Sequence, residues 1–255
     1  MSVGDSETIT AAMVVIGDEI LSGRTKDLNI GYLADHLTAI GIQLREVRIV
    51  PDVEAEIVEA LNALRTRNTY VFTTGGIGPT HDDITADSVA AAFGVTIDVD
   101  PRAVAIMQPY YAERGLEFTD ARRRMARIPD GADLIENAVS NAPGFMLENV
   151  IVMAGIPKVM QVMLDAVTPK LRTGAKMLSK TIALHRPESE ISDLLGKAQE
   201  TWPDVSMGSY PFFEDGSYGT QMVFRSTDAA QLDVVTAHVR QALDARGWEE
   251  MSREG

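Results

Sequence analysis

Residues 73–85, with the sequence TTGGIGPTHDDIT, join a glycine-rich loop to two adjacent carboxylates and are the segment best suited to chemistry. Gly75, Gly76 and Gly78 follow a short strand-like run, and open parallel sheets bind their ligands beyond the carboxyl ends of the strands. Glycine lets the backbone adopt positive φ and approach a ligand closely. Because the loop N–H groups and the N-terminus of the next helix together attract an anion, the segment predicts a phosphate-binding site.

Asp82 and Asp83 place two negative charges beside this predicted phosphate site. An exposed helix N-terminus stabilises an anion by only about 0.3–1 kcal/mol per charge, which is too little to overcome that repulsion. A divalent cation such as Mg²⁺, held by one or two carboxylates and by phosphate oxygens, would remove the conflict. In the alternative interpretation Asp83 caps the helix that begins at residues 84–85, and Asp82 is solvated.

Three further groups could contribute to a ligand site. GDEILSG, residues 17–23, follows the first predicted strand, and its Asp18 and Glu19 are either ligand or metal contacts or part of a solvated turn. Asp52 follows the second predicted strand, and taken alone it is more typical of a helix N-cap. The arginines of ARRRMAR, residues 121–127, either supply positive charge to an anionic ligand or form one solvated helix face.

These groups must be positioned by an alternation of strands and helices. Continuous apolar runs are typical of strands buried on both faces, and apolar residues at helical spacing separate them. This order predicts a parallel sheet with helices on both faces, joined by right-handed crossovers. The predicted strands are residues 11–17, 42–50 and 69–74, and the predicted helices begin near residues 27, 51 and 85.

The second half of the chain is less regular. Near residue 173 the pattern changes to strand, helix, strand, strand, helix, which predicts a small α+β unit after the α/β unit. The predicted domains are residues 9–172 and 175–247. Before that change the predicted elements are helices over 101–114 and 119–128, two short strands within 144–155 and a helix from 156.

The composition disfavours several classes of function. Lys and Arg number 23 against 37 Asp and Glu, a net charge of −14, whereas a protein that binds nucleic acid needs a basic face. The chain has no cysteine, which excludes disulfides, cysteine-ligated zinc and thiol catalysis. No apolar run approaches the roughly 20 residues of a membrane helix, and the N-terminus lacks the pattern of a signal peptide. We therefore expect a cytoplasmic protein with neither nucleic acid nor a membrane as partner.

Five segments together resemble a known family. GDEILSG, GIQLREVRIVPD, TTGGIGPTHDDIT, NAPGF and AGIP occur in the order and approximate spacing of the molybdopterin-binding (MoaB/MogA-like) domain. Residues 9–170 most resemble the version in competence/damage-inducible protein A (CinA) and in the N-terminal part of eukaryotic FAD synthases. The tail resembles the small middle domain of CinA proteins. The resemblance implies a three-layer α/β/α domain with a mostly parallel sheet and a ligand groove along the carboxyl ends of its strands.

The resemblance also implies a ligand and site residues. Members of the family bind a phosphorylated pterin or hydrolyse nucleotide pyrophosphates such as ADP-ribose or FAD with a divalent metal, here Mg²⁺, Mn²⁺ or Co²⁺. Asp52 and Asp83 match two aspartates that matter in molybdenum-cofactor enzymes, and with Asp82 they are the expected catalytic residues. The expected ligand contacts are Gly17, Gly75, Gly76, Gly78, Thr80, Thr85, Arg123, Asn141 and Gly155, and the expected metal ligands are Asp18, Glu19, Asp82 and Asp83.

Three functions remain open: a metal-dependent nucleotide pyrophosphatase, a non-catalytic module that binds molybdopterin or a nucleotide, and a molybdopterin adenylyltransferase of molybdenum-cofactor biosynthesis. Val159 stands where an acidic residue is typical of CinA, which tells against hydrolysis. Full-length CinA carries a further C-terminal amidohydrolase domain that has no counterpart before residue 255, so nicotinamide-nucleotide deamidation is not expected. Because relatives commonly assemble as dimers or trimers, a homo-oligomer is expected.

Overall fold

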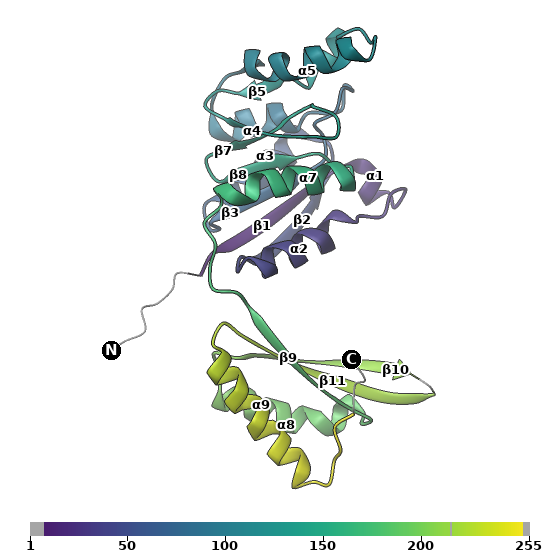
Figure 1. Ribbon diagram of the computed structural model, residues 1–255, viewed down its shortest axis with the longest axis vertical. Helices are drawn as coiled ribbons and strands as arrows, with labels where there is room; N and C mark the ends of the chain where they lie inside the picture. The colour runs from purple at the N-terminus through teal and green to yellow at the C-terminus, as the bar shows by residue number, and fades with distance from the viewer. Residues whose placement is uncertain (1–7, 215, 252–255) are drawn as a thin grey trace, which may run out of the picture. The chain divides into compact units, whose positions relative to one another are not determined.

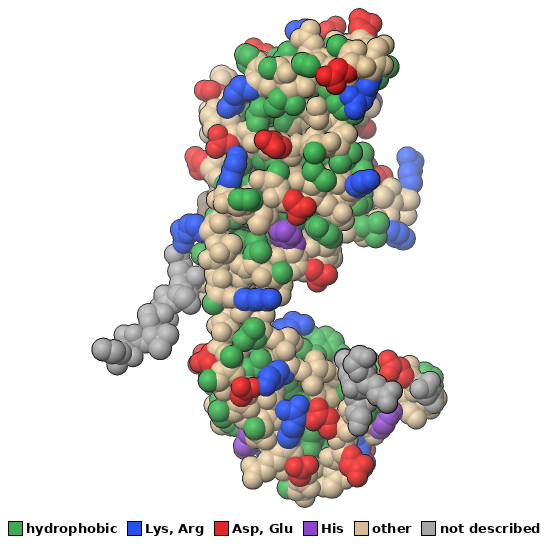
Figure 2. Space-filling model, viewed as in Figure 1, with side chains coloured by type: hydrophobic (Ala, Val, Ile, Leu, Met, Phe, Trp, Pro, Cys, Tyr) green, Lys and Arg blue, Asp and Glu red, His purple; other side chains and the backbone are tan. Residues whose placement is uncertain are grey.

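The chain divides into two structural units, and the boundary lies between Gly174 and Ala175. The computed structural model describes residues 8–214 and 216–251. Figure 1 shows strands flanked by helices in the first unit, and a smaller antiparallel sheet with two helices in the second. Acidic and basic side chains are interspersed over the face shown in Figure 2. No helix in the described ranges is long and apolar enough to span a bilayer.

The first unit is built on one six-stranded sheet. Its strands are β1 (Thr10–Ile16), β2 (Gln43–Val50), β3 (Tyr70–Thr74), β6 (Asp133–Ile135), β7 (Gly144–Leu147) and β8 (Val150–Met153). Their order is β2-β1-β3-β8-β7-β6. The four neighbours β2, β1, β3 and β8 are parallel, whereas β7 is antiparallel to both β8 and β6. The carboxyl ends of four strands therefore meet at one edge of the sheet.

Helices connect these strands and cover both faces of the sheet. They are α1 (Asp18–Leu21), α2 (Asn29–Ala39), α3 (Glu54–Arg65), α4 (Thr85–Phe93), α5 (Pro101–Glu113), α6 (Asp120–Arg124) and α7 (Pro157–Val167), with a 3₁₀ turn over Thr168–Lys170. A separate two-stranded antiparallel sheet pairs β4 (Ile97–Val99) with β5 (Arg127–Pro129).

Strand β1 shows how the three layers are held together. Its residues 11–16 are at most 2% exposed, because successive side chains point to opposite faces of a strand and both faces are covered. The side chains that pack toward α3, α4 and α5 are Ala12, Val14 and Ile16, and those that pack toward α2 and α7 are Ala11, Met13 and Val15. The sheet lies between these two helical layers (Figure 1), which confirms the predicted three-layer α/β/α architecture with a mostly parallel sheet.

The second unit has the predicted strand–helix–strand–strand–helix order. Its elements are β9 (Leu178–Leu184), α8 (Glu188–Thr201), β10 (Ser206–Glu214), β11 (Ser217–Ser226) and α9 (Ala229–Asp244). The strands form an antiparallel sheet in the order β10-β11-β9. Apolar residues of β9 and β11 pack against both helices in a core of their own. The small α+β prediction is confirmed.

Three local predictions were wrong. The helix predicted over 119–128 ends at Arg124, and Arg127–Pro129 forms β5, because this segment pairs with β4 and Ile128 is drawn into the core. The helix predicted from residue 51 begins at Glu54, because Val53 is extended with φ −126° and ψ 117°. Residues 18–21 form the short helix α1 where only a turn was expected.

Phe72→Ala tests the packing of the central strand β3. The Phe72 ring is 0% exposed, so its removal should lower the free energy of unfolding by about 3–5 kcal/mol. The control is Phe213→Ala, a residue that is 60% exposed and whose ring meets the Tyr218 ring at a tilted angle, so its loss should stay below about 1.5 kcal/mol. Urea denaturation followed by far-UV circular dichroism measures both, and equal losses would contradict this core.

Candidate functional site

The glycine loop after β3 is held by the first residue of α4. The Thr85 hydroxyl donates to the Gly75 carbonyl at 2.9 Å, and the Thr85 N–H donates to the Gly76 carbonyl at 3.0 Å. Thr85 is fully buried, so both bonds are shielded from water. The backbone is left-handed at Gly75, with φ 103°, and at Gly76, with φ 63°. A conformation that favours glycine is therefore fixed by a buried side chain.

The loop also excludes side chains by close packing. A Cβ added to Gly75 would lie 2.1 Å from the Ile16 carbonyl oxygen at the end of β1. One added to Gly76 would lie 2.2 Å from the Thr85 hydroxyl oxygen, and one added to Gly78 would lie 2.6 Å from a carboxylate oxygen of Asp83. Real Cβ atoms do not approach other atoms so closely, which explains why three glycines stand in four positions.

Three consecutive main-chain N–H groups of this loop are free to bind an external acceptor. The Gly75 N–H donates to the Met153 carbonyl, and the Thr80 N–H donates to the Asp83 carboxylate. Within the described ranges, the N–H groups of Gly76, Ile77 and Gly78 donate to no acceptor. We call these three groups the amide nest. Successive free N–H groups in such a turn attract an anion.

Asp83 shapes the loop, and its carboxylate does not cap α4. One Asp83 carboxylate oxygen accepts hydrogen bonds from the Thr80 N–H at 2.8 Å and from the Thr80 hydroxyl at 2.5 Å. The N-cap of α4 is Ile84, and no side chain caps that helix. The alternative interpretation of Asp83 as a helix cap is therefore wrong, and the carboxylate instead closes a turn beside Gly78.

Asp52 lies within electrostatic reach of three other acidic residues, Asp18 and Glu19 of α1 and Asp82 of this turn. The Asp52 carboxylate accepts a hydrogen bond from the Asp18 N–H at 3.0 Å, so it bridges the ends of β1 and β2 and does not cap α3, whose N-cap is Val53. Burial raises the pKa of Asp52, and the charges of Asp18, Glu19 and Asp82 raise it further against the opposing Asp18 hydrogen bond. We call these four residues the acidic cluster.

No ready-made metal site is present in the described part of the chain, where no three His, Cys, Asp or Glu side chains gather closely enough to hold an ion. The structure brings Asp18, Glu19 and Asp82 within electrostatic reach of Asp52. It directs the Asp83 carboxylate to Thr80. The predicted metal ligands therefore stay a prediction that requires the carboxylates to converge around the ion.

The remaining predicted contacts lie at different distances from the loop. Gly155 lies against it, because a Cβ on Gly155 would be 3.2 Å from the Gly75 Cα. The Gly17 N–H is already hydrogen-bonded at the edge of the sheet, because it donates to the Val50 carbonyl. Asn141 has a left-handed φ of 57° and donates to the Asn137 carbonyl, and Arg123 lies over the Phe118 ring. Neither Asn141 nor Arg123 hydrogen-bonds to the glycine loop.

Two polar residues at the site were not predicted. The Asn29 side-chain amide donates to the Gly155 carbonyl at 2.8 Å, while its buried carbonyl oxygen has no partner. A terminal nitrogen of Arg124 donates to the Asp83 carbonyl at 3.2 Å. The basic run at 121–127 indicated a cation here. Which of its arginines reaches the loop depends on where α6 ends, and the sequence did not show this.

Exposed aliphatic side chains at the same edge were also missed. Leu28 and Ile156 are each 66% exposed, and they adjoin the hydrogen bond between Asn29 and Gly155. Leu21 and Val53 are 53% and 45% exposed. Leu28 and Val53 stand at helical spacing with apolar residues of α2 and α3, but each is the N-cap residue that precedes its helix. Val159, by contrast, is only 7% exposed and packs in the core under α7.

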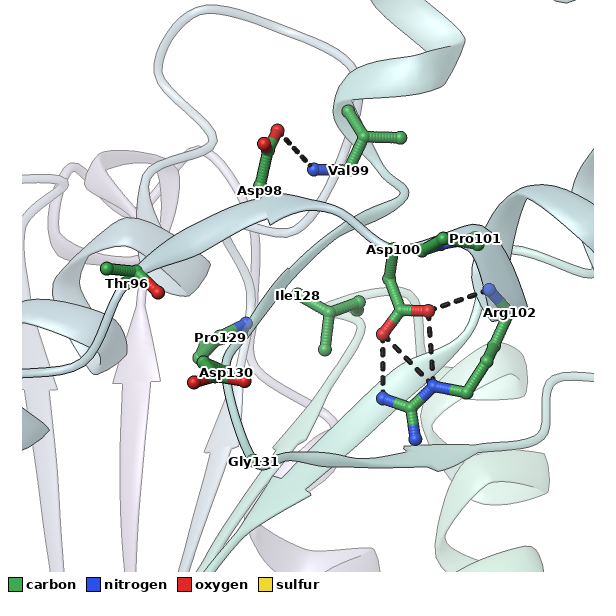
Figure 3. Close-up of a pocket in the computed structure, with 10 residues that line it drawn as sticks. All are labelled: Thr96, Asp98, Val99, Asp100, Pro101, Arg102, Ile128, Pro129, Asp130 and Gly131. Atoms are coloured by element: carbon green, nitrogen blue, oxygen red, sulfur yellow. Dashed lines mark hydrogen bonds and ion pairs between the residues drawn. The ribbon is translucent and has the colours of Figure 1, made fainter.

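A hollow of about 180 Å³ lies elsewhere, between β4, β5 and the start of α5 (Figure 3). Its main polar groups satisfy each other, because the Arg102 guanidinium is 2.7 Å from the Asp100 carboxylate and also donates to the Ala132 carbonyl. The Asp98 carboxylate accepts from the Val99 N–H. None of the predicted site residues lines this hollow, so the glycine loop is the candidate functional site.

A comparison against known families identifies the family of the first unit. A family described as the probable molybdopterin binding domain matches residues 12–173. The chain belongs to this family. The FAD synthase middle domain matches residues 176–251, which form the second unit. The family predicted from the sequence motifs is confirmed.

Individual relatives agree with this assignment. A protein of Aeropyrum pernix is 33% identical over 252 residues, 94% of each chain. A CinA-like protein of Desulfosudis oleivorans is 32% identical over 209 residues, which cover 78% of this chain and 51% of that protein. The solved structure of CinA from Thermoplasma acidophilum is 33% identical, with a TM-score of 0.58, and covers 63% of this chain and 96% of that chain. The CinA-like character of the chain is thereby shown.

Gly76→Ala tests whether the loop has room for a side chain. The matched control is Gly94→Ala, because Gly94 has nearly the same φ, 68°, and no atom within 4 Å of an added Cβ. Both variants carry the left-handed penalty of about 1–2 kcal/mol. Only Gly76→Ala adds the clash with the Thr85 hydroxyl, which should cost a further 1–3 kcal/mol or so, roughly the cost of overpacking. Equal losses on urea denaturation would refute the close packing.

Asp52→Asn tests whether a charge on Asp52 is unfavourable in the folded state, through its burial and the repulsion of the acidic cluster. Because the pKa of Asp52 is raised in the folded state, the native protein loses stability as the pH rises through that pKa. An amide keeps an acceptor for the Asp18 N–H and carries no charge. We therefore expect Asp52→Asn to raise the Tm by roughly 1–3 °C at about pH 7, and the gain to vanish below about pH 4, the range of an unfolded aspartate.

The control for this pH series is Asp35→Asn, which alters an exposed carboxylate on α2. Scanning calorimetry from acid to neutral pH measures both variants. A lower Tm for Asp52→Asn at neutral pH, or the same shift in both variants, would show that the cluster is not repulsive.

Proposed function

We propose that the first unit binds a phosphorylated pterin or nucleotide at the glycine loop and, with a divalent cation, hydrolyses nucleotide pyrophosphates such as ADP-ribose or FAD. The amide nest is the observation that carries the proposal. Gly76, Ile77 and Gly78 hold three N–H groups free of internal acceptors at the carboxyl edge of a parallel sheet, just before the N-terminus of α4. The family's description as molybdopterin-binding supports a ligand of this class.

The apolar part of the proposed ligand has a matching surface. Leu28 and Ile156 are exposed and are the sequence neighbours of Asn29 and Gly155, which share a hydrogen bond, and Gly155 lies against Gly75. An exposed aliphatic pair beside a phosphate cradle suits a planar heterocycle, because ligand sites combine apolar walls with a few directed polar groups. Both pterins and nucleotides join such a ring to a phosphate.

The chemistry of the acidic cluster fits a hard divalent cation. Oxygen ligands of this kind suit Mg²⁺ and Mn²⁺. Burial raises the pKa of Asp52, and the charges of Asp18, Glu19 and Asp82 raise it further, so a cation would offset charge that is unfavourable here. Asp18, Glu19 and Asp82 are the residues that would hold the ion. A bound cation lowers the pKa of a coordinated water and neutralises charge that develops on a phosphoryl group.

The chain's own groups would do the rest of the work. The amide nest would orient one phosphate through hydrogen bonds that strengthen as negative charge develops on its oxygens. Asp52, whose pKa is raised toward the working pH, would accept a proton from the attacking water. Asp83 would keep the loop in its binding conformation through its two hydrogen bonds to Thr80.

A non-catalytic binding module is the second candidate, and Val159 favours it. Val159 is a residue of α7 and is buried in the core, at a position where the resemblance expects an acid. If that acid is needed for hydrolysis, the site binds its ligand without turnover. The third alternative, adenylylation of molybdopterin, uses the same phosphate cradle but requires ATP.

One assay separates the candidates. Hydrolysis predicts release of AMP from ADP-ribose or FAD when Mn²⁺ is added, none with EDTA, and at least about a hundredfold loss in Asp83→Ala if the loop conformation orients the phosphate. The control variant Asp35→Ala should retain full activity. Ligand-induced thermal stabilisation of about RT ln(1 + [L]/Kd) without AMP would favour pure binding. Consumption of ATP only when molybdopterin is supplied would favour adenylylation.

A further inference from the structure

Arg124 brings a positive charge to the glycine loop from a distant part of the chain. It is the last residue of α6, and one terminal nitrogen of its guanidinium donates to the Asp83 main-chain carbonyl at 3.2 Å. The Asp83 carboxylate in turn lies so close to Gly78 that it leaves no room for a Cβ there. A single residue, Asp83, therefore connects Arg124 to the Gly78 end of the amide nest.

The guanidinium of Arg124 is incompletely bonded. Its Nε is buried and has no hydrogen-bond partner. Arg124 makes no ion pair with any described carboxylate, whereas Arg127, three residues on, pairs with Asp87 at 2.6 Å. An arginine has five N–H donors in a fixed fork, so this one keeps unused donors beside the loop. A buried donor without a partner is unfavourable and marks a place where a ligand acceptor would be stabilised.

Its two neighbours on α6 are engaged elsewhere. The Arg122 guanidinium lies 4.4 Å from the centre of the Tyr111 ring and donates to the Glu117 carbonyl. The Arg123 guanidinium lies 5.9 Å from the centre of the Phe118 ring. Of the three successive arginines, Arg124 is the one that reaches the glycine loop. In a chain of net charge −14, an anion needs such a local cation.

We infer that Arg124 binds the second phosphate of a diphosphate whose first phosphate occupies the amide nest, and so selects diphosphates over monophosphates. The inference rests on the proposed function. One phosphate can be bound by the three N–H groups alone, whereas a second adds further negative charge next to the acidic cluster. A guanidinium fork matches phosphate oxygens and offsets that charge, which an array of neutral amides cannot do.

The test compares two ligands and two matched variants. Arg124→Met is titrated calorimetrically, in the full chain with Mg²⁺, with the non-hydrolysable α,β-methylene-ADP and with AMP. The control is Arg65→Met, because the Arg65 guanidinium also donates to a main-chain carbonyl, that of Ala92, at 3.2 Å, but lies away from the loop. Circular dichroism and Tm establish that both variants are folded.

We expect Arg124→Met to weaken α,β-methylene-ADP binding at least about tenfold and AMP binding less than about threefold, as for loss of a charge-assisted bond. Arg65→Met should change neither affinity, and Arg124→Lys should restore part of the loss. The inference is overturned if Arg124→Met weakens the binding of both nucleotides equally. It is also overturned if Arg124→Met binds α,β-methylene-ADP as tightly as Arg65→Met does. If either of these results is found and the wild-type chain still releases AMP from ADP-ribose, only the role of Arg124 fails. If it binds neither nucleotide, the proposed function fails as well.

Discussion

The hydrogen bond from the buried Thr85 hydroxyl to the Gly75 carbonyl is the interaction on which the candidate site depends. It ties the N-terminus of α4 to the end of β3, and the Thr85 N–H repeats the tie at Gly76. The loop is thereby pressed against the end of β1, where only glycine fits. The carbonyls of Gly75 and Gly76 accept internal hydrogen bonds. The N–H groups of the amide nest have no acceptor among the described residues and are available to a ligand.

The same edge of the sheet carries an electrostatic conflict. Parallel strands end side by side, so the segments after β1, β2 and β3 place Asp18 and Asp82 within electrostatic reach of Asp52. Like charges held in one place are unfavourable unless a cation or a proton compensates them. A site that combines anion-binding amides with an acidic cluster is therefore incomplete by itself, and this incompleteness is typical of functional sites.

Much of this arrangement could be predicted from the sequence. The alternation of apolar runs and helical spacing gave the three-layer fold, because burial on both faces leaves a strong pattern in strands such as β1. The glycine loop and Asp52 were identifiable because their types and spacing follow strands directly. Local sequence could not show that Asp52 bonds to Asp18, because that bond depends on how two separate segments fold against each other. The bond between Asp83 and Thr80 is local, but the sequence allowed a helix cap for Asp83 equally well.

Other features depended on the three-dimensional structure. Arg123 and Arg124 are indistinguishable by composition, and the end of α6 decides which one touches the Asp83 loop. Leu28 belongs to an apolar helical pattern but precedes α2, so it is exposed. Asn29 gave no sequence signal at all, because its role is a contact with Gly155, more than a hundred residues away along the chain.

The most direct test of the central claim follows the amide nest itself. In a ¹⁵N–¹H correlation spectrum of the labelled chain, titration with α,β-methylene-ADP and Mg²⁺ should shift the Gly76, Ile77 and Gly78 resonances downfield, as new acceptors meet these N–H groups. Saturable shifts confined to other regions, such as the hollow around Arg102, with these three resonances unmoved, would contradict the account.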